Sequence, residues 1–124
     1  MSADAAVSTT PLEQKHNELY TVCEETGLTN ERMIFVAETI LTRLYDDKRP
    51  LPSMNAPDDK TIVLKWDEGT KKRKKERSLV IEDWYVRFDF CDGYRLSLGM
   101  HTSTLWVTKL FEYLDEFRVL QPSK

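Results

Sequence analysis

The chain has 124 residues, of which 40% are hydrophobic and 31% are charged, and its formal net charge at neutral pH is −3. This length and balance are typical of one folded domain and exclude a disordered chain. No hydrophobic run reaches the length that spans a membrane, and the first ten residues lack the basic start and apolar stretch of a signal peptide. The two cysteines, Cys23 and Cys91, lie far apart in the sequence, which favours an intracellular, cytoplasmic setting with reduced thiols.

The chain is expected to form a single domain between two short tails. Residues 1–10 are small and polar and predict a disordered N-terminal tail. The domain is expected to cover residues 11–120, and residues 121–124 are expected to form a C-terminal tail. No internal repeat divides it.

Two helices are predicted at the start of the domain. The first begins at Pro11, which suits a first helical turn, and ends at Gly27, which suits the left-handed position after a helix. The second begins after Thr29 or Asn30, since both residue types cap helix N-termini. Its inward face repeats at helical spacing and comprises Met33, Val36, Ala37, Ile40, Leu41 and Leu44.

The second helix carries more apolar residues than one buried face needs. Ile34, Phe35 and Tyr45 lie outside the inward set, so the helix is apolar over more than half of its circumference. Such a helix is either enclosed within the fold or pressed against a partner.

A proline-rich connection and a first strand follow. Residues 49–59 contain three prolines and no periodicity, which predicts an extended connection along the surface. Residues 61–66 predict a strand with Ile62, Leu64 and Trp66 on one face. The basic run at 71–77 is expected to form a loop, and Ser78 to open a long second strand.

This second strand, over residues 78–90, changes its apolar parity midway. The apolar residues expected to face inward are Leu79 and Ile81 at odd positions and Trp84, Val86, Phe88 and Phe90 at even positions. A β-bulge at Glu82-Asp83 would keep all six on one face of the sheet.

The second and third strands form a hairpin whose register follows from the side-chain pattern. A two-residue turn at Asp92-Gly93 would set the apolar residues of one strand opposite the polar residues of the other, so that register fails. A three-residue loop at 91–93 places every apolar residue on one face, and Gly93 can adopt the left-handed conformation that this loop requires. The inner pairs are Trp84–Met100, Val86–Leu98, Phe88–Leu96 and Phe90–Tyr94, and the outer pairs are Tyr85–Gly99, Arg87–Ser97 and Asp89–Arg95.

A last helix is predicted after the capping residues at 101–104. Its apolar stripe comprises Val107, Leu110, Phe111, Leu114 and Phe117. The predicted fold class is therefore α+β, with two N-terminal helices, a three-stranded antiparallel meander and a C-terminal helix packed on one face of the sheet. The core is expected to hold the aromatic residues Trp66, Trp84, Phe88, Phe90, Phe111 and Phe117.

The sequence carries no motif for catalysis, and we expect neither an enzyme nor a cofactor. His16 lies on the apolar stripe of the first helix and His101 at a strand-to-helix junction, where structural and capping roles are expected. Nothing near Cys91 in the sequence would lower the pKa of its thiol. The four glycines are far from one another in the sequence, whereas a phosphate-binding loop needs several glycines close together. No close pair of cysteine or histidine ligands predicts a metal site.

The charge of the chain is unevenly spread. Six bases, Lys71, Lys72, Arg73, Lys74, Lys75 and Arg77, stand in one run with a single acid, whereas the rest of the chain has twelve bases against twenty acids, a balance of −8. The sequence therefore predicts an acidic body with one basic loop, which allows a local but not a general attraction to a polyanion.

From residue 30 onward, the order of elements resembles that of double-stranded RNA-binding domains. Such domains contact phosphates and 2′-hydroxyls through a strand-connecting loop and a helix N-terminus. The resemblance implies nucleic-acid binding through residues 71–77, but the chain lacks that family's loop motif and a lysine cluster at the start of the last helix. The alternative is a solvated loop that balances nearby acids such as Asp67 and Glu68.

The leading prediction is a domain that binds another protein, or itself, as an adaptor, inhibitor or assembly factor. The predicted helices carry more apolar residues than one face of a small sheet can cover. The residues left over include Phe35, Trp106 and Tyr113. The outer face of the sheet would carry Tyr85, Arg87, Asp89 and Arg95, and tyrosine and arginine are enriched at interface hot spots. The alternative is that the remaining apolar side chains only pack against the first helix and the proline-rich connection.

Overall fold

The structure, a computed structural model, describes residues 10–67, 76–83, 85–89, 95–99 and 105–122. Within them, two helices are followed by five strands and a third helix. The helices are α1 (Pro11–Thr26), α2 (Glu31–Asp46) and α3 (Leu105–Glu116), and the strands are β1 (Ser53–Asp58), β2 (Thr61–Asp67), β3 (Glu76–Ile81), β4 (Tyr85–Asp89) and β5 (Arg95–Gly99). The α+β class is confirmed, but the prediction of three strands is wrong.

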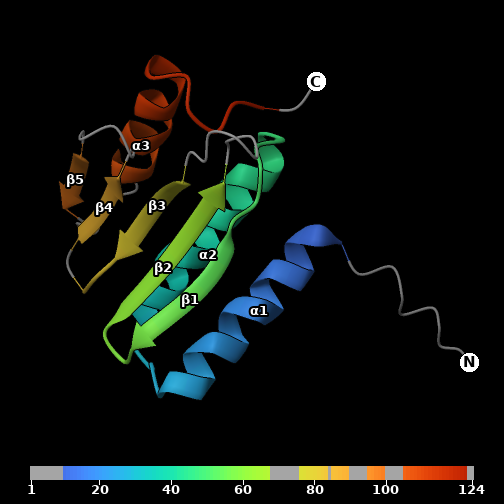
Figure 1. The fold of residues 1–124 in the computed structure, drawn as a ribbon, viewed down its shortest axis with the longest axis vertical. Helices are drawn as coiled ribbons and strands as arrows, with labels where there is room; N and C mark the ends of the chain where they lie inside the picture. The colour runs from blue at the N-terminus through green and yellow to red at the C-terminus, as the bar shows by residue number, and fades with distance from the viewer. Residues whose placement is uncertain (1–9, 68–75, 84, 90–94, 100–104, 123–124) are drawn as a thin grey trace, which may run out of the picture.

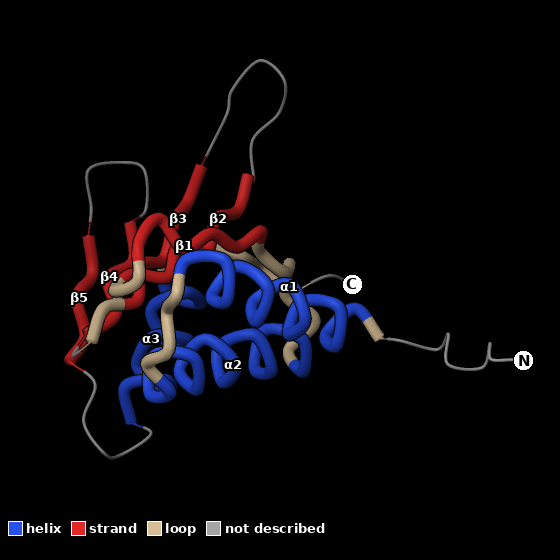
Figure 2. The backbone as a smooth tube through the Cα atoms, turned by 90° about the horizontal axis from the view of Figure 1, so that it is seen from below, coloured by secondary structure: helices blue, strands red, loops and turns tan. Residues whose placement is uncertain are grey.

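The molecule has two layers. The five strands form one antiparallel sheet in the order β1-β2-β3-β4-β5. The helices lie on one side of this sheet, with α1 along the β1 edge and α3 toward the β5 edge (Figures 1 and 2). Helix α2 lies between them, behind the strands in the view of Figure 1.

The boundaries of α1 and α2 follow from their capping residues. The side chain of Thr10 accepts a hydrogen bond from the Glu13 amide, and Gly27 ends α1 in the left-handed conformation with a φ of 76°. The side chain of Asn30 accepts hydrogen bonds from the Arg32 and Met33 amides at the start of α2. All six residues of the predicted inward face of α2 are buried.

Strand β1 replaces part of the predicted proline-rich connection. Its Met54 pairs with Leu64 of β2, and Met54 and Ala56 turn inward and are buried. Pro57 has no amide to donate, and the pairing with β2 is interrupted between Asn55 and Asp58. An edge strand tolerates such an interruption, which is why proline content misled the prediction.

Strands β3 and β4 correct the prediction of one long bulged strand. The chain reverses after Glu82, whose amide donates to the carbonyl of Tyr85 at 2.9 Å. Leu79 then pairs with Phe88 across the two strands, and Ile81 pairs with Val86. A bulge and a reversal both bring odd and even apolar residues to one face, so the parity change has a different cause from the one predicted.

The predicted register of the β4–β5 hairpin is confirmed for the described residues. The observed pairs are Tyr85–Gly99, Val86–Leu98, Arg87–Ser97, Phe88–Leu96 and Asp89–Arg95. The pairs Trp84–Met100 and Phe90–Tyr94 and the loop at 91–93 lie outside the described residues.

The core contains most of the predicted aromatic residues that the structure describes. Trp66, Phe88 and Phe111 are buried, whereas Trp84 and Phe90 lie outside the described residues. The placement of Phe117 in the core is wrong, since it is 50% exposed. The helix ends at Glu116, the Val119 amide donates back to the Leu114 carbonyl at 2.8 Å, and Val119 and Leu120 enter the core instead.

A buried arginine connects the ends of α2 and α3. Arg49 is 7% exposed; its guanidinium donates to the carbonyl of Leu120 at 3.2 Å and to the Asp115 carboxylate at 2.5 Å. Its Nε also donates to the Asp47 carboxylate at 3.3 Å, and its charge lies 5.4 Å from the Phe111 ring centroid. These contacts satisfy the buried charge, as a buried arginine requires.

Replacing Arg49 with alanine is expected to lower the free energy of unfolding by about 2 kcal/mol, because the buried Leu120 carbonyl and the Asp115 carboxylate lose their donor. Arg43→Ala is the matched control: Arg43 also lies over the Phe111 ring but is exposed, so its loss should cost less than about 1 kcal/mol. Urea denaturation measures both, and equal losses would contradict the role given to burial.

Candidate functional site

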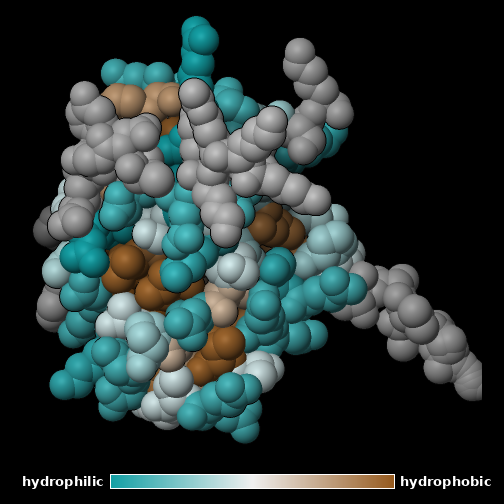
Figure 3. Space-filling view, in the orientation of Figure 1, coloured by the Kyte–Doolittle hydropathy of each residue, from teal (hydrophilic) through white to brown (hydrophobic). Residues whose placement is uncertain are grey.

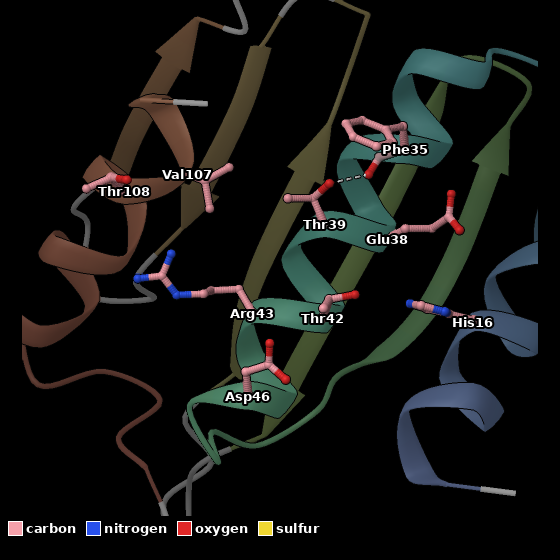
Figure 4. Close-up of a pocket in the computed structure, with 9 residues that line it drawn as sticks. All are labelled: His16, Phe35, Glu38, Thr39, Thr42, Arg43, Asp46, Val107 and Thr108. Atoms are coloured by element: carbon pink, nitrogen blue, oxygen red, sulfur yellow. Dashed lines mark hydrogen bonds between the residues drawn. The ribbon is translucent and has the colours of Figure 1, made fainter. Parts of the chain in front are cut away.

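A groove of about 450 Å³ lies on the side of α2 that faces away from the sheet (Figure 4). Helix α2 supplies its floor, α1 lies at one wall and α3 at the other. The lining residues are His16 from α1, Phe35, Glu38, Thr39, Thr42, Arg43 and Asp46 from α2, and Val107 and Thr108 from α3. The groove exists because α2 buries its inward face against the sheet while its flanking helices stand on either side of its outward face.

Phe35 is the large apolar side chain at one end of this groove. It is 64% exposed, although its helix neighbours Val36 and Ala37 are buried. The threonines farther along the floor are short, and the hydroxyl of Thr39 donates to the Phe35 carbonyl at 2.8 Å within the helix. The groove therefore presents an aromatic ring beside a shallow floor.

The α1 wall is held by a hydrogen bond between helices. The hydroxyl of Tyr20 donates to the Glu38 carboxylate. This hydrogen bond, together with partial burial and the negative charge of Glu38, raises the pKa of Tyr20 above its ordinary value. The ring of His16 lies 6.4 Å from that of Tyr20, and its Nε2 is buried with no hydrogen-bond partner among the described residues.

The positive charge of the groove comes from Arg43 of α2, on the side that faces α3. The guanidinium carbon of Arg43 lies 5.0 Å from the Phe111 ring centroid, and its Nε lies 3.5 Å from the Asp47 carboxylate. Figure 4 shows Arg43 directed toward α3, and Glu38 directed toward α1. The floor of the groove therefore carries a negative charge on its α1 side and a positive charge on its α3 side.

Two of the predicted contact residues on the outer sheet face, Tyr85 and Arg87, already have a partner in Glu82. Tyr85 is 38% exposed, and its hydroxyl donates to the Glu82 carboxylate at 3.2 Å. Arg87 lies 3.7 Å from the same carboxylate, and Asp89 is half-buried opposite Arg95. The side chain of Arg95 lies outside the description. In Figure 3, which looks onto the strands, hydrophobic areas are divided by hydrophilic side chains.

The remaining predicted contact residues do not join Phe35 in one surface. Trp106 is half-buried and packs against the core. Tyr113 is half-buried and stacks on Phe117, with ring centroids 6.3 Å apart. Of the three helical residues predicted as contacts, the groove is lined by Phe35 alone.

The predicted nucleic-acid residues fall mostly outside the described part of the chain. Lys71, Lys72, Arg73, Lys74 and Lys75 are not described. Arg77 belongs to β3, pairs with Trp66 in the ladder and is 8% exposed. Arg77 is therefore part of the sheet rather than of an exposed basic loop.

The sequence interpretation missed the polar residues of the groove. Glu38, Thr39, Thr42, Arg43 and Asp46 recur at helical spacing opposite the inward face of α2, and this signal could have identified the outward face. The walls could not have been found this way, because they depend on where α1 and α3 pack.

Comparisons with protein-family models, with curated proteins and with solved structures find no significant match. Among the described residues, no three His, Cys, Asp or Glu side chains are grouped so that they could hold a metal ion. In the same part of the chain, no helix has the length and hydrophobicity needed to cross a bilayer.

Tyr20→Phe is expected to lower the free energy of unfolding by about 0.5–1 kcal/mol at pH 7, because the hydrogen bond to Glu38 is lost. The folded pKa of Tyr20 is raised above 10.0, so the folded state holds the phenol proton more tightly than the unfolded chain does. The stabilisation by the Tyr20 hydrogen bond should be fully present below pH 10 and should fall as the pH rises through the pKa of Tyr20 in the folded protein. Urea denaturation of both proteins at several pH values measures it, and a difference that grows above pH 10 would contradict the assignment.

Proposed function

We propose that the chain is a non-enzymatic protein-binding domain and that its contact surface is the groove over α2. The observation that carries the proposal is the exposed Phe35 at the end of a concave site. Aromatic side chains that lie beside a pocket are typical anchors of protein interfaces, since they bury large apolar areas on binding.

The dimensions of the groove suit a helical segment of another protein. Phe35 and Asp46 are eleven residues apart on α2, which corresponds to about 16 Å at the rise of an α-helix. This length accommodates about three turns of a bound helix. Recognition of an amphipathic helix in a groove between helices is a recurring mode of peptide binding.

The outer sheet face is a weaker candidate for the contact. The carboxylate of Glu82 lies between Tyr85 and Arg87, and Lys65 lies 3.7 Å from the Glu76 carboxylate. These polar groups already have partners within the sheet, so a bound protein would have to compete for them. In the described part of the basic run, Arg77 is buried, which gives no support to nucleic-acid binding.

Selection from a phage-displayed library of helical peptides tests the proposal. We expect enriched peptides with apolar residues at helical spacing. Phe35→Ala should weaken their binding at least tenfold, because truncating an interface anchor costs more than about 1.4 kcal/mol.

Tyr85→Ala is the matched control, since it removes an exposed aromatic residue from the opposite side of the sheet. It should leave the binding of the selected peptides unchanged. The proposal fails if no helical peptide is enriched, or if the enriched peptides depend on Tyr85 and not on Phe35.

A further inference from the structure

We infer that the groove over α2 is specific for a basic amphipathic helix, which places two lysine or arginine side chains near Glu38 and Asp46 and its apolar side chains over the threonine floor against Phe35. This inference rests on the proposed function and adds the chemistry of the ligand. Among the described residues, the fold leaves two negative charges of the groove without an ion pair.

The positive charge beside the groove is already balanced. Arg43 lies 3.5 Å from the Asp47 carboxylate, which lies 3.3 Å from Arg49, and Arg49 lies 2.5 Å from the Asp115 carboxylate. Two arginines and two aspartates thus form one chain of ion pairs. Arg43 therefore has little charge to offer to a ligand.

Within the described part of the chain, the two acidic residues that line the groove have no ion-pair partner. Glu38 accepts a hydrogen bond from the neutral hydroxyl of Tyr20, which does not offset its charge. Asp46 is exposed, and no ion pair to it is found among the described residues. A ligand with positive charges at these two places would be attracted by both carboxylates.

The spacing of the two acids defines the pattern of the ligand. Glu38 and Asp46 are eight residues apart, about 12 Å along α2. On a helix that lies along the groove, side chains seven or eight residues apart share one face at a similar distance. The space between the acids lies over Thr39 and Thr42, where short side chains leave room for the apolar residues of the ligand.

The experiment uses three synthetic helical peptides of about fourteen residues, or four turns. They share one leucine stripe and differ only at two positions seven residues apart, which hold Lys and Lys, Gln and Gln, or Glu and Glu. Fluorescence anisotropy with the full chain should rank their affinities in that order, with at least a tenfold difference between the lysine and glutamate peptides.

The double variant Glu38→Lys/Asp46→Lys should reverse this ranking. The variant Glu24→Lys/Asp59→Lys is the matched control, since it makes the same change in net charge at exposed residues outside the groove lining. It should keep the original ranking. If both double variants shift the ranking alike, net charge and not the groove governs binding, and the inference is overturned.

The outcomes separate this inference from the proposed function. Equal binding of the three peptides, lost in Phe35→Ala, would overturn the charge specificity and leave the groove as a protein-binding site. If no peptide binds in a way that depends on Phe35, and the phage selection also enriches no Phe35-dependent peptide, the inference and the proposed function fail together.

Discussion

The structure depends on a sheet that buries one of its two faces. Side chains alternate along each strand, so Ile62, Leu64, Leu79, Ile81 and Phe88 meet on the same side and are each at most 1% exposed. The helices must cover this face, and α2 does so at the centre with its whole inward stripe. Because that packing fixes the orientation of α2, the opposite face of the helix points outward, between α1 and α3. The groove is thus a by-product of the core.

The second support of the groove is the region around Arg49, where α2 and α3 end. Three residues other than glycine adopt left-handed backbones here: Lys48, Arg118 and Leu120, with φ between 51° and 59°. Each such conformation costs about 1 kcal/mol or more for a residue with a side chain. Arg49 follows Lys48 directly and donates to the Leu120 carbonyl, so its hydrogen bonds fix the segments that carry this strain. The same arginine pairs with Asp47, which also pairs with Arg43 of the groove. Arg49 therefore contributes both to the fold and to the charge balance of the groove.

The sequence was most informative where a strict period constrains the chain. The β4–β5 register was predictable because a shift by one residue would send Val86 and Phe88 to solvent. Strand β1 was not predictable from periodicity, because it is short, contains Pro57 and depends on pairing with β2. The change of apolar parity before Tyr85 correctly predicted that the residues on both sides of it share one face of the sheet. It was assigned to a β-bulge, whereas the structure has a chain reversal there. Phe117 fits the helical repeat, yet the helix ends one residue before it.

The candidate site was less predictable than the fold for a related reason. Phe35 was identified from sequence because it is apolar and lies off the inward stripe of α2. Glu38 and Asp46 are ordinary surface acids in the sequence, and only the positions of Tyr20, Arg43 and Val107 in space make them part of a groove. Trp106 and Tyr113 looked equivalent to Phe35 in the helical pattern, but tertiary packing covers each of them in part.

The proposed site requires Phe35 to belong to a contact surface and not to the core of the fold. The most direct test of this requirement is the free energy of unfolding of Phe35→Asp, measured by urea denaturation beside Ala37→Asp, which places the same charge two residues away on the buried face of α2. We expect the free energy of unfolding to change by no more than about 0.5 kcal/mol in Phe35→Asp and to fall by at least about 3 kcal/mol in Ala37→Asp. A comparable loss for Phe35→Asp would show that its ring stabilises the fold and is not free to form a contact surface.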